Sequence, residues 1–148
     1  MKPFFRTQER KDELFEVLES WEGTPYRHHA GVKYYGVDCA FFIGSVLIEL
    51  GVIESFRATE YARDFCFHSY SDEGFGKHLR EHPILEEVGF KNPMDGDIVL
   101  YKFGRVAGHS AFYFDGNSWQ ARSKIGVVKL DWSIDYNRLT YGFRVMEK

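Results

Sequence analysis

The sequence has few cysteines, no excess of basic residues and no long apolar run. Its two cysteines, Cys39 and Cys66, are too few for a disulfide framework and lack the close Cys/His spacing of a zinc site. No segment approaches the ~18 uninterrupted apolar residues of a membrane-spanning helix. Basic residues number 19 and acidic residues 22, so the net charge of −3 provides no basic stripe for nucleic acid. We therefore expect no metal, no cofactor, no nucleic-acid partner and no membrane span.

The composition is that of a folded domain. Hydrophobic residues make up 44% and aromatic residues 18% of the chain, which supplies large packing units for one core. Because 148 residues are too few for two ordinary cores, we expect a single domain over residues 1–148. Residues 1–20 turn charged early and contain no apolar h-region, which predicts synthesis in the cytoplasm without a signal peptide.

The amino-terminal half predicts two helices. Over residues 8–21, apolar side chains recur at helical spacing between charged ones. Residues 23–36, "GTPYRHHAGVKYYG", have glycine at both ends and Pro25 inside, which is typical of a loop. The next segment, "DCAFFIGSVLIELG", predicts a buried helix, because Asp38 is a favoured N-cap residue and Gly51 is a favoured residue just past a helix end.

The carboxy-terminal half predicts strands. A turn cluster at residues 92–97 is followed by strand-like segments joined by short turns, at residues 98–103, 109–114, 118–121, 126–130 and 139–146. Residues 52–83 give mixed signals, and we expect only short helices there. Helices followed by an antiparallel meander predict an α+β fold, with the N-terminal helices packed on an antiparallel sheet of about five to six strands.

Cys39 follows the predicted N-cap residue, and four roles are open to it. It could be a small buried hydrophobe, half of a disulfide with Cys66, a metal ligand or a nucleophile. The start of a helix stabilises a thiolate through its unpaired N–H groups and the positive end of its dipole. The same N–H groups could stabilise an oxyanion that forms when the thiolate attacks a carbonyl. Position alone therefore makes Cys39 a candidate nucleophile.

A cysteine nucleophile needs an imidazole partner and a group that orients it. Among the histidines, His109 is the best candidate because it follows Gly108 and opens a predicted strand, with one face toward the helix and the other toward solvent. Gln120 lies in the next predicted strand, where its amide could orient the ring. Read alone, such a histidine is more often an ordinary strand-end residue, and such a glutamine is more often a solvent-facing strand residue.

The adjacent pair His28 and His29 raises the possibility of a metal site together with Cys39 and His109. Neighbouring side chains are expected to project in different directions, and the pair lacks the spacing of a helical metal motif. We therefore predict no metal ligands among these residues.

Four blocks of the sequence, taken in order, resemble the NlpC/p60 family of papain-like cysteine peptidases. They match the Trp-x-Gly-Thr-Pro-Tyr, Asp-Cys, Gly-Asp-strand and His-strand-turn-strand blocks of that family and cover nearly the whole chain. In this sequence they read "WEGTPYRHHAG", "GVDCAFFIGSVLIELG", "DGDIVLYKFGRVAGHSAFYF" and "SWQA".

The resemblance implies hydrolysis of peptide bonds in peptidoglycan stem peptides, of the D-γ-glutamyl-diamino acid type. It implies that Cys39 attacks, that His109 acts as base and then as acid, and that Gln120 is the third polar residue. Tyr26 matches a family tyrosine whose hydroxyl borders the site. Asp38 matches the acid beside the nucleophile, which would cap the helix and receive a substrate ammonium.

The amino-acid sequences of several segments most resemble the phage-type branch of the family, which includes tail-associated and gene-transfer-agent cell wall peptidases. The segments are "TPYRHH", "DGDIVLYKF" and "YGFRV". This resemblance implies phage-like tail proteins as partners, and a location on a virion or tail or release by lysis.

Two positions depart from the family pattern, because relatives usually follow Asp-Cys with Ser-Gly. This chain has Ala40 and Phe41 there, which leaves the choice of substrate open. Two alternatives therefore stand beside the peptidase. One is a catalytically inactive structural or adaptor component of a phage-like tail, and the other is a thiol amidase or acyl hydrolase acting on a non-peptidoglycan substrate.

Overall fold

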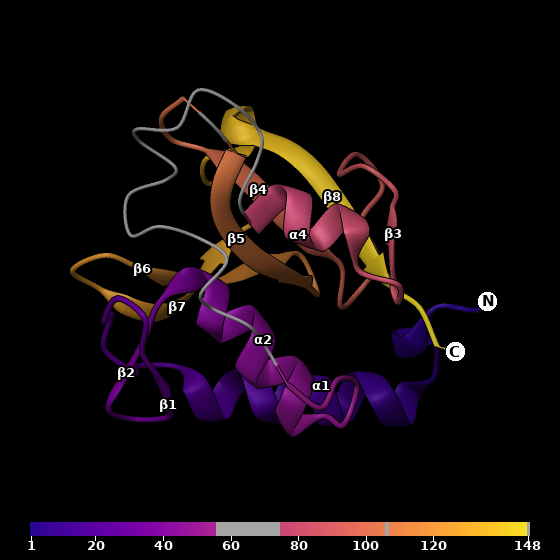
Figure 1. Cartoon of the computed structure of the whole chain (residues 1–148), viewed down its shortest axis with the longest axis horizontal. Coiled ribbons are helices and arrows are strands. Elements are labelled where there is room, and N and C mark those ends of the chain that lie inside the picture. The colour runs from indigo at the N-terminus through magenta and orange to yellow at the C-terminus, as the bar shows by residue number, and fades with distance from the viewer. Residues whose placement is uncertain (56–74, 106, 148) are drawn as a thin grey trace.

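The computed structural model describes residues 1–55, 75–105 and 107–147, and it confirms the predicted α+β fold (Figure 1). Six antiparallel strands form one sheet in the order β3-β8-β4-β5-β6-β7, so the last strand of the chain lies inside the sheet. A separate two-stranded hairpin consists of β1 and β2. The bounds are β1 (Gly31–Val32), β2 (Gly36–Val37), β3 (Leu85–Glu87), β4 (Ile98–Lys102), β5 (Ala107–Phe114), β6 (Asn117–Arg122), β7 (Gly126–Asp131) and β8 (Leu139–Val145).

Three α-helices lie in the described part of the chain, and the first two have the predicted positions. Helix α1 (Gln8–Trp21) begins after Thr7, whose hydroxyl accepts a hydrogen bond from the Arg10 N–H. Helix α2 (Cys39–Glu49) begins after Asp38 and ends before Gly51, which has a φ of +74°. Helix α4 (Phe75–Glu81) lies in the segment where we expected short helices.

The main core lies between the sheet and the helices. Figure 1 shows α1 and α2 together beneath the sheet and α4 against its β4 and β8 side. The rings of Phe42 on α2 and Phe112 on β5 pack edge to face, and those of Phe15 on α1 and Phe114 stack. A second, smaller cluster covers the opposite face of the sheet and includes the buried residues Val99, Tyr101, Ala111 and Leu139. Both faces of the central strands are therefore buried.

The structure differs from the prediction in five short elements. Strands β1 and β2 lie within the segment that we predicted to be loop, and β3 was not predicted. Short 3-10 helices occur at Phe4–Arg6 and Tyr136–Arg138. Cys66 falls on residues 56–74, so this residue and the disulfide considered between it and Cys39 lie outside the described residues.

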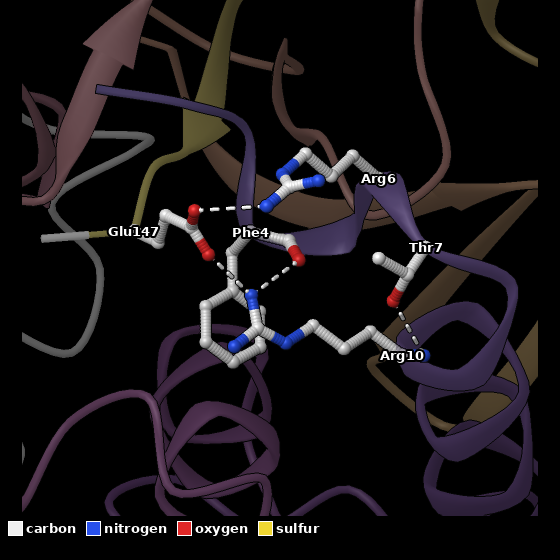
Figure 2. A network of polar contacts seen from close by, with 5 residues as sticks. All are labelled: Phe4, Arg6, Thr7, Arg10 and Glu147. Atoms are coloured by element: carbon white, nitrogen blue, oxygen red, sulfur yellow. Dashed lines mark hydrogen bonds and ion pairs between the residues drawn. The ribbon is translucent and has the colours of Figure 1, made fainter.

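The two ends of the described chain are held together by polar contacts (Figure 2). The carboxylate of Glu147 accepts hydrogen bonds from Arg6 at 3.2 Å and from Arg10 at 2.6 Å. The Arg10 guanidinium also lies over the Phe4 ring, 4.0 Å from its centroid. These contacts join the segment after β8 to the first turn of α1 and the residues before it. Of the described helices, none has both the length and the apolar character needed to cross a bilayer.

Candidate active site

Cys39 is the first residue of α2, as predicted, and it is half-buried. The preceding residue, Asp38, is the N-cap, and its Oδ1 accepts a 2.8 Å hydrogen bond from the Phe41 N–H. The backbone carbonyl of Asp38 accepts from the Phe42 N–H at 2.9 Å. The thiol therefore projects from the positive end of a well-capped helix.

The carboxylate of Asp38 is also held from the loop before β1. Its Oδ2 accepts a 2.8 Å hydrogen bond from the His29 N–H and lies 3.7 Å from Nδ1 of His28. Asp38 is only 1% exposed. Its capping role is confirmed, while its proposed contact with a substrate ammonium stays a prediction.

Cys39 lies against the beginning of β5, the strand that carries His109. Its Sγ is 3.9 Å from the carbonyl oxygen of Gly108, and its backbone carbonyl accepts a 2.9 Å hydrogen bond from the Ser110 hydroxyl. Because Gly108 and Ser110 flank His109, the structure brings the thiol next to the backbone of the predicted base. These residues are far apart in the sequence, and the fold alone joins them.

The ring of His109 is fixed by Gln120 on β6. Ring atom Nε2 lies 2.7 Å from Oε1 of Gln120, and the Gln120 side-chain amide donates a 2.8 Å hydrogen bond to the Ser118 hydroxyl. An amide oxygen can only accept, so His109 donates through Nε2–H and its Nδ1 carries the lone pair when the ring is neutral. Gln120 is 1% exposed, so the solvent-facing alternative for this residue is wrong.

The side of β5 that faces away from α2 is largely covered by protein, contrary to expectation, with Ala111 buried and His109 half-buried. Ser110 and Phe112 point toward α2, whereas the His109 ring lies 5.9 Å from the Tyr101 ring and 5.4 Å from the Phe103 ring. Burial is the main cause that lowers the pKa of His109 from 6.5 to about 4, and the hydrogen bond with Gln120 opposes this shift. The imidazole is therefore neutral at pH 7, as a general base must be.

Tyr26 lies beside the helix start through its backbone. It forms a parallel bridge with Val37, in which Val37 N–H donates to the Pro25 carbonyl at 2.9 Å and Arg27 N–H donates to the Val37 carbonyl at 3.0 Å. Val37 is two residues before Cys39. The structure thus places Tyr26, half-buried, near the nucleophile, and the role of its hydroxyl stays a prediction.

The expectation that His28 and His29 project in different directions is wrong. Their rings stack with centroids 3.9 Å apart, which is possible because His29 adopts a left-handed backbone with a φ of 57°. The ring of Phe41 lies edge-on to His29 at 6.3 Å. In the described ranges, no group of three or more His, Cys, Asp or Glu side chains is placed to hold a metal ion.

The two positions that depart from the family pattern occupy different environments. Ala40 is fully buried in the main core. Phe41 is half-buried, and a side chain placed on Gly31 would meet its ring at 2.8 Å. Phe41 therefore packs on the β1–β2 hairpin beside the thiol, and a larger residue at position 31 would displace it.

Three polar residues of the site were not predicted from the sequence, namely Ser110, Ser118 and Arg122. Arg122 Nη1 donates to Oε1 of Gln120 at 3.3 Å and to Asp135 at 2.8 Å. Ser118 and Arg122 stand two residues either side of Gln120, so strand periodicity places all three on one face of β6. The alternation of side chains along β6 is therefore the feature of the sequence that could have identified Ser118 and Arg122 as neighbours of Gln120.

Comparisons with protein-family models and with curated proteins give no match. Solved structures do match. An NLP/P60 family protein, similar to a lipoprotein, from Staphylococcus aureus has a TM-score of 0.66 at 18% identity, over 99% of this chain and 44% of that one. The NlpC/p60 domain of the peptidoglycan hydrolase SagA has a TM-score of 0.60 at 14% identity, over 93% of this chain and 98% of that one. The peptidoglycan hydrolase RipB from Mycobacterium tuberculosis has a TM-score of 0.64 at 17% identity, over 99% of this chain and 69% of that one.

The chain has the NlpC/p60 fold. The predicted fold is thus confirmed, including the helix that begins with the cysteine and the strands that carry His109 and Gln120. The chain spans less than half of the Staphylococcus aureus protein, so the NlpC/p60 fold is one part of that longer chain.

Proposed function

We propose that the protein is a cysteine peptidase that hydrolyses peptide bonds in peptidoglycan stem peptides. The observation that carries this proposal is the 2.7 Å contact between His109 and Gln120 on strands next to the helix-start Cys39. Two of the structures with the same fold are described as peptidoglycan hydrolases, which supports a cell wall substrate. The finer assignment, the bond between D-γ-glutamate and a diamino acid, rests on the family resemblance.

The proposed reaction begins with proton transfer from the Cys39 thiol to Nδ1 of the neutral His109 ring. The thiolate attacks the carbonyl carbon of the scissile bond, and the imidazolium then donates its proton to the leaving amine. Water attacks the resulting thioester while His109 accepts a proton, and the acid product leaves as the thiol is restored. Gln120 keeps Nε2–H bound throughout and so leaves Nδ1 as the only basic nitrogen of the ring.

The pKa of His109 decides which form of the pair is present at rest. With a pKa of about 4, the ring stays neutral near pH 7, so the resting pair is a thiol and an imidazole rather than an ion pair. The helix start lowers the cost of forming the thiolate during the reaction. We therefore propose general-base activation of Cys39 at the moment of attack.

We further propose a phage-type origin and a particle- or tail-associated location, for which the sequence blocks of residues 24–29, 95–103 and 141–145 are the support. Phage-like tail proteins would then be partners of the chain. Co-purification of the chain with assembled particles tests this, and its absence from purified particles of the producing strain would contradict it.

The decisive experiment is release of stem-peptide fragments from purified sacculi, followed by mass spectrometry of the products. The native protein should release fragments, and Cys39→Ala should reduce release to background, because the nucleophile is lost. Cys66→Ala is the matched control, since it removes the other cysteine of the sequence and should retain activity. Equal release by the native protein and Cys39→Ala would overturn the proposal.

Two outcomes of the same assay would point to the alternatives. Binding to tail components without release of any fragment would indicate an inactive adaptor. Hydrolysis of lipid esters or simple amides, while stem peptides stay uncleaved, would indicate a thiol hydrolase with another substrate. The product masses also identify the scissile bond and the diamino acid.

A further inference from the structure

The side-chain amide of Gln120 can occupy its buried site in two orientations, related by exchange of oxygen and nitrogen. One orientation presents Oε1 to His109, as the structure shows, and the other would present the NH2 group. Ser118, the partner at the other end of the amide, carries a hydroxyl that both donates and accepts. Ser118 therefore satisfies either orientation and does not select between them.

Arg122 differs from Ser118 because a guanidinium only donates hydrogen bonds and stays charged at every accessible pH. Its Nη1 lies 3.3 Å from Oε1 of Gln120. In the exchanged orientation the same nitrogen would face an NH2 group, and two donors would oppose each other beside a positive charge. Among the described neighbours of the amide, Arg122 is the one that distinguishes oxygen from nitrogen.

The guanidinium of Arg122 is itself held in place from two sides. Nη1 also donates to the Asp135 carboxylate at 2.8 Å, and the guanidinium lies 5.4 Å from the centroid of the Phe103 ring. The Phe103 ring in turn lies edge-on to His109 at 5.4 Å. Arg122 thus contacts both the amide that binds His109 and the ring that packs against it.

We propose that Arg122 is a positioning residue that fixes the orientation of the Gln120 amide and thereby holds His109 in the Nε2–H tautomer. This inference rests on the proposed function for its consequence, which is that Nδ1 remains the nitrogen that accepts the thiol proton. If the amide were exchanged, its NH2 group would donate to Nε2, and the ring proton would move to Nδ1. The ring would then present an N–H group in place of a base.

The first test measures the tautomer directly and does not depend on activity. Two-bond ¹H–¹⁵N spectra of uniformly labelled protein at pH 7 distinguish a protonated from an unprotonated ring nitrogen. The native protein should show His109 as the Nε2–H form, and Arg122→Met should show a mixture with the Nδ1–H form. Arg122→Lys keeps a charged, donor-only group and should retain the native tautomer. An unchanged tautomer in a folded Arg122→Met protein would overturn the proposal.

Arg138→Met is the matched control. The Arg138 guanidinium lies over the same Phe103 ring at 5.9 Å and carries the same charge, and within the described residues it makes no hydrogen bond with Gln120. Its loss should leave the His109 tautomer unchanged. A tautomer shift of equal size in Arg138→Met would assign the effect to charge or ring packing and would overturn the role of Arg122.

The second test measures hydrolysis of stem peptides by the same variants. Arg122→Met should lower kcat about tenfold with little change in KM, the loss expected when one hydrogen bond to a charged group stops supporting the transition state. Arg122→Lys should restore most of the rate, and Arg138→Met should stay close to native. If the native protein hydrolyses nothing while Arg122→Met still shifts the tautomer, the proposed function fails and the positioning role stands. Native kcat in Arg122→Met would overturn the positioning role.

Discussion

The hydroxyl of Ser110 donates a 2.9 Å hydrogen bond to the backbone carbonyl of Cys39. This contact joins the first residue of α2 to the strand that carries His109, and Ser110 is fully buried where it does so. Strand β5 therefore contributes to the site twice, through His109 and through the tether that the next residue, Ser110, makes to the nucleophile. The distance between thiol and imidazole depends on this tether as well as on the side chains themselves.

Ser110→Ala should slow hydrolysis more than it destabilises the protein. The loss of one buried hydrogen bond is expected to lower the free energy of unfolding by about 1 kcal/mol, measured by urea denaturation. Release of stem-peptide fragments should fall because α2 is no longer fixed against β5. Ser123→Ala, which removes an exposed hydroxyl in the turn between β6 and β7, is the control and should leave both quantities at native values. Native activity in a Ser110→Ala protein would show that the tether does not position the nucleophile.

Replacement of Asp38 tests how much the cap supports the site. Asp38→Ala removes the acceptor of the Phe41 and His29 N–H groups, and the free energy of unfolding should fall by about 2 kcal/mol. Asp38→Ser keeps an oxygen that caps the Phe41 N–H, so its loss should be about half as large. Thermal or urea denaturation measures both variants, and equal losses would mean that the capping bond contributes little.

The ion pair of Arg144 and Asp97 joins β8 to the turn before β4, with Asp97 buried and Arg144 half-buried. Arg144 donates from Nε and Nη2 to the two carboxylate oxygens of Asp97 at 3.0 and 2.9 Å. The hydrogen bond to Asp97 raises the pKa of the Arg144 guanidinium, so the pair stays charged. Asp97 is 1% exposed, and it also accepts from the Met94 N–H.

Arg144→Met should lower the free energy of unfolding by about 3 kcal/mol, because it leaves a buried carboxylate without its partner. Arg6→Met is the control, since Arg6 is an exposed partner of Glu147 and its loss should change stability by less than about 1 kcal/mol. Urea denaturation at pH 7 compares the two variants. A loss in Arg144→Met no larger than that in Arg6→Met would contradict the structural role of the pair.

The two long helices and the strands β4 to β8 could be predicted because each carries its own local signal. Apolar spacing and the flanking residues Asp38 and Gly51 define α2, and alternation defines the strands. Strand β3 has no such signal. It consists of three residues that pair with β8 from the end of the chain, and β1 and β2 have two residues each. Such elements form because distant segments meet, and a local pattern does not report them.

Part of the site could also be predicted, because some of its residues carry local signals in the sequence. Helix-start position marked Cys39, and strand position marked His109 and Gln120, while the resemblance supplied their roles. The burial of Gln120 was missed because polar alternation on one strand usually means a solvent-facing side. Here a second cluster covers that side, and Ser118 and His109 satisfy the amide. The stacking of His28 on His29 was missed because it depends on one left-handed residue.

The pKa of His109 predicts how stability changes with pH. The pKa is about 4 in the folded protein and 6.5 for an ordinary histidine, so between these values the unfolded chain binds a proton that the folded chain does not. The contribution to stability is therefore complete above pH 6.5 and is lost as the pH falls from 6.5 toward 4. The slope from one such group is at most about 1.4 kcal/mol per pH unit.

Urea denaturation from pH 4 to 7 should show this decline in the native protein and a flatter profile in His109→Gln, which has no imidazole at this position. Cys39→Ala keeps the ring and should keep the native slope, which separates the imidazole from the thiol. The acid limb of kcat/KM for stem peptides should likewise lie near pH 4, because the base stays neutral until then. An acid limb near pH 6.5, or equal slopes in the native protein and His109→Gln, would mean that the packing of the half-buried His109 ring against Tyr101 and Phe103 does not shield it from solvent.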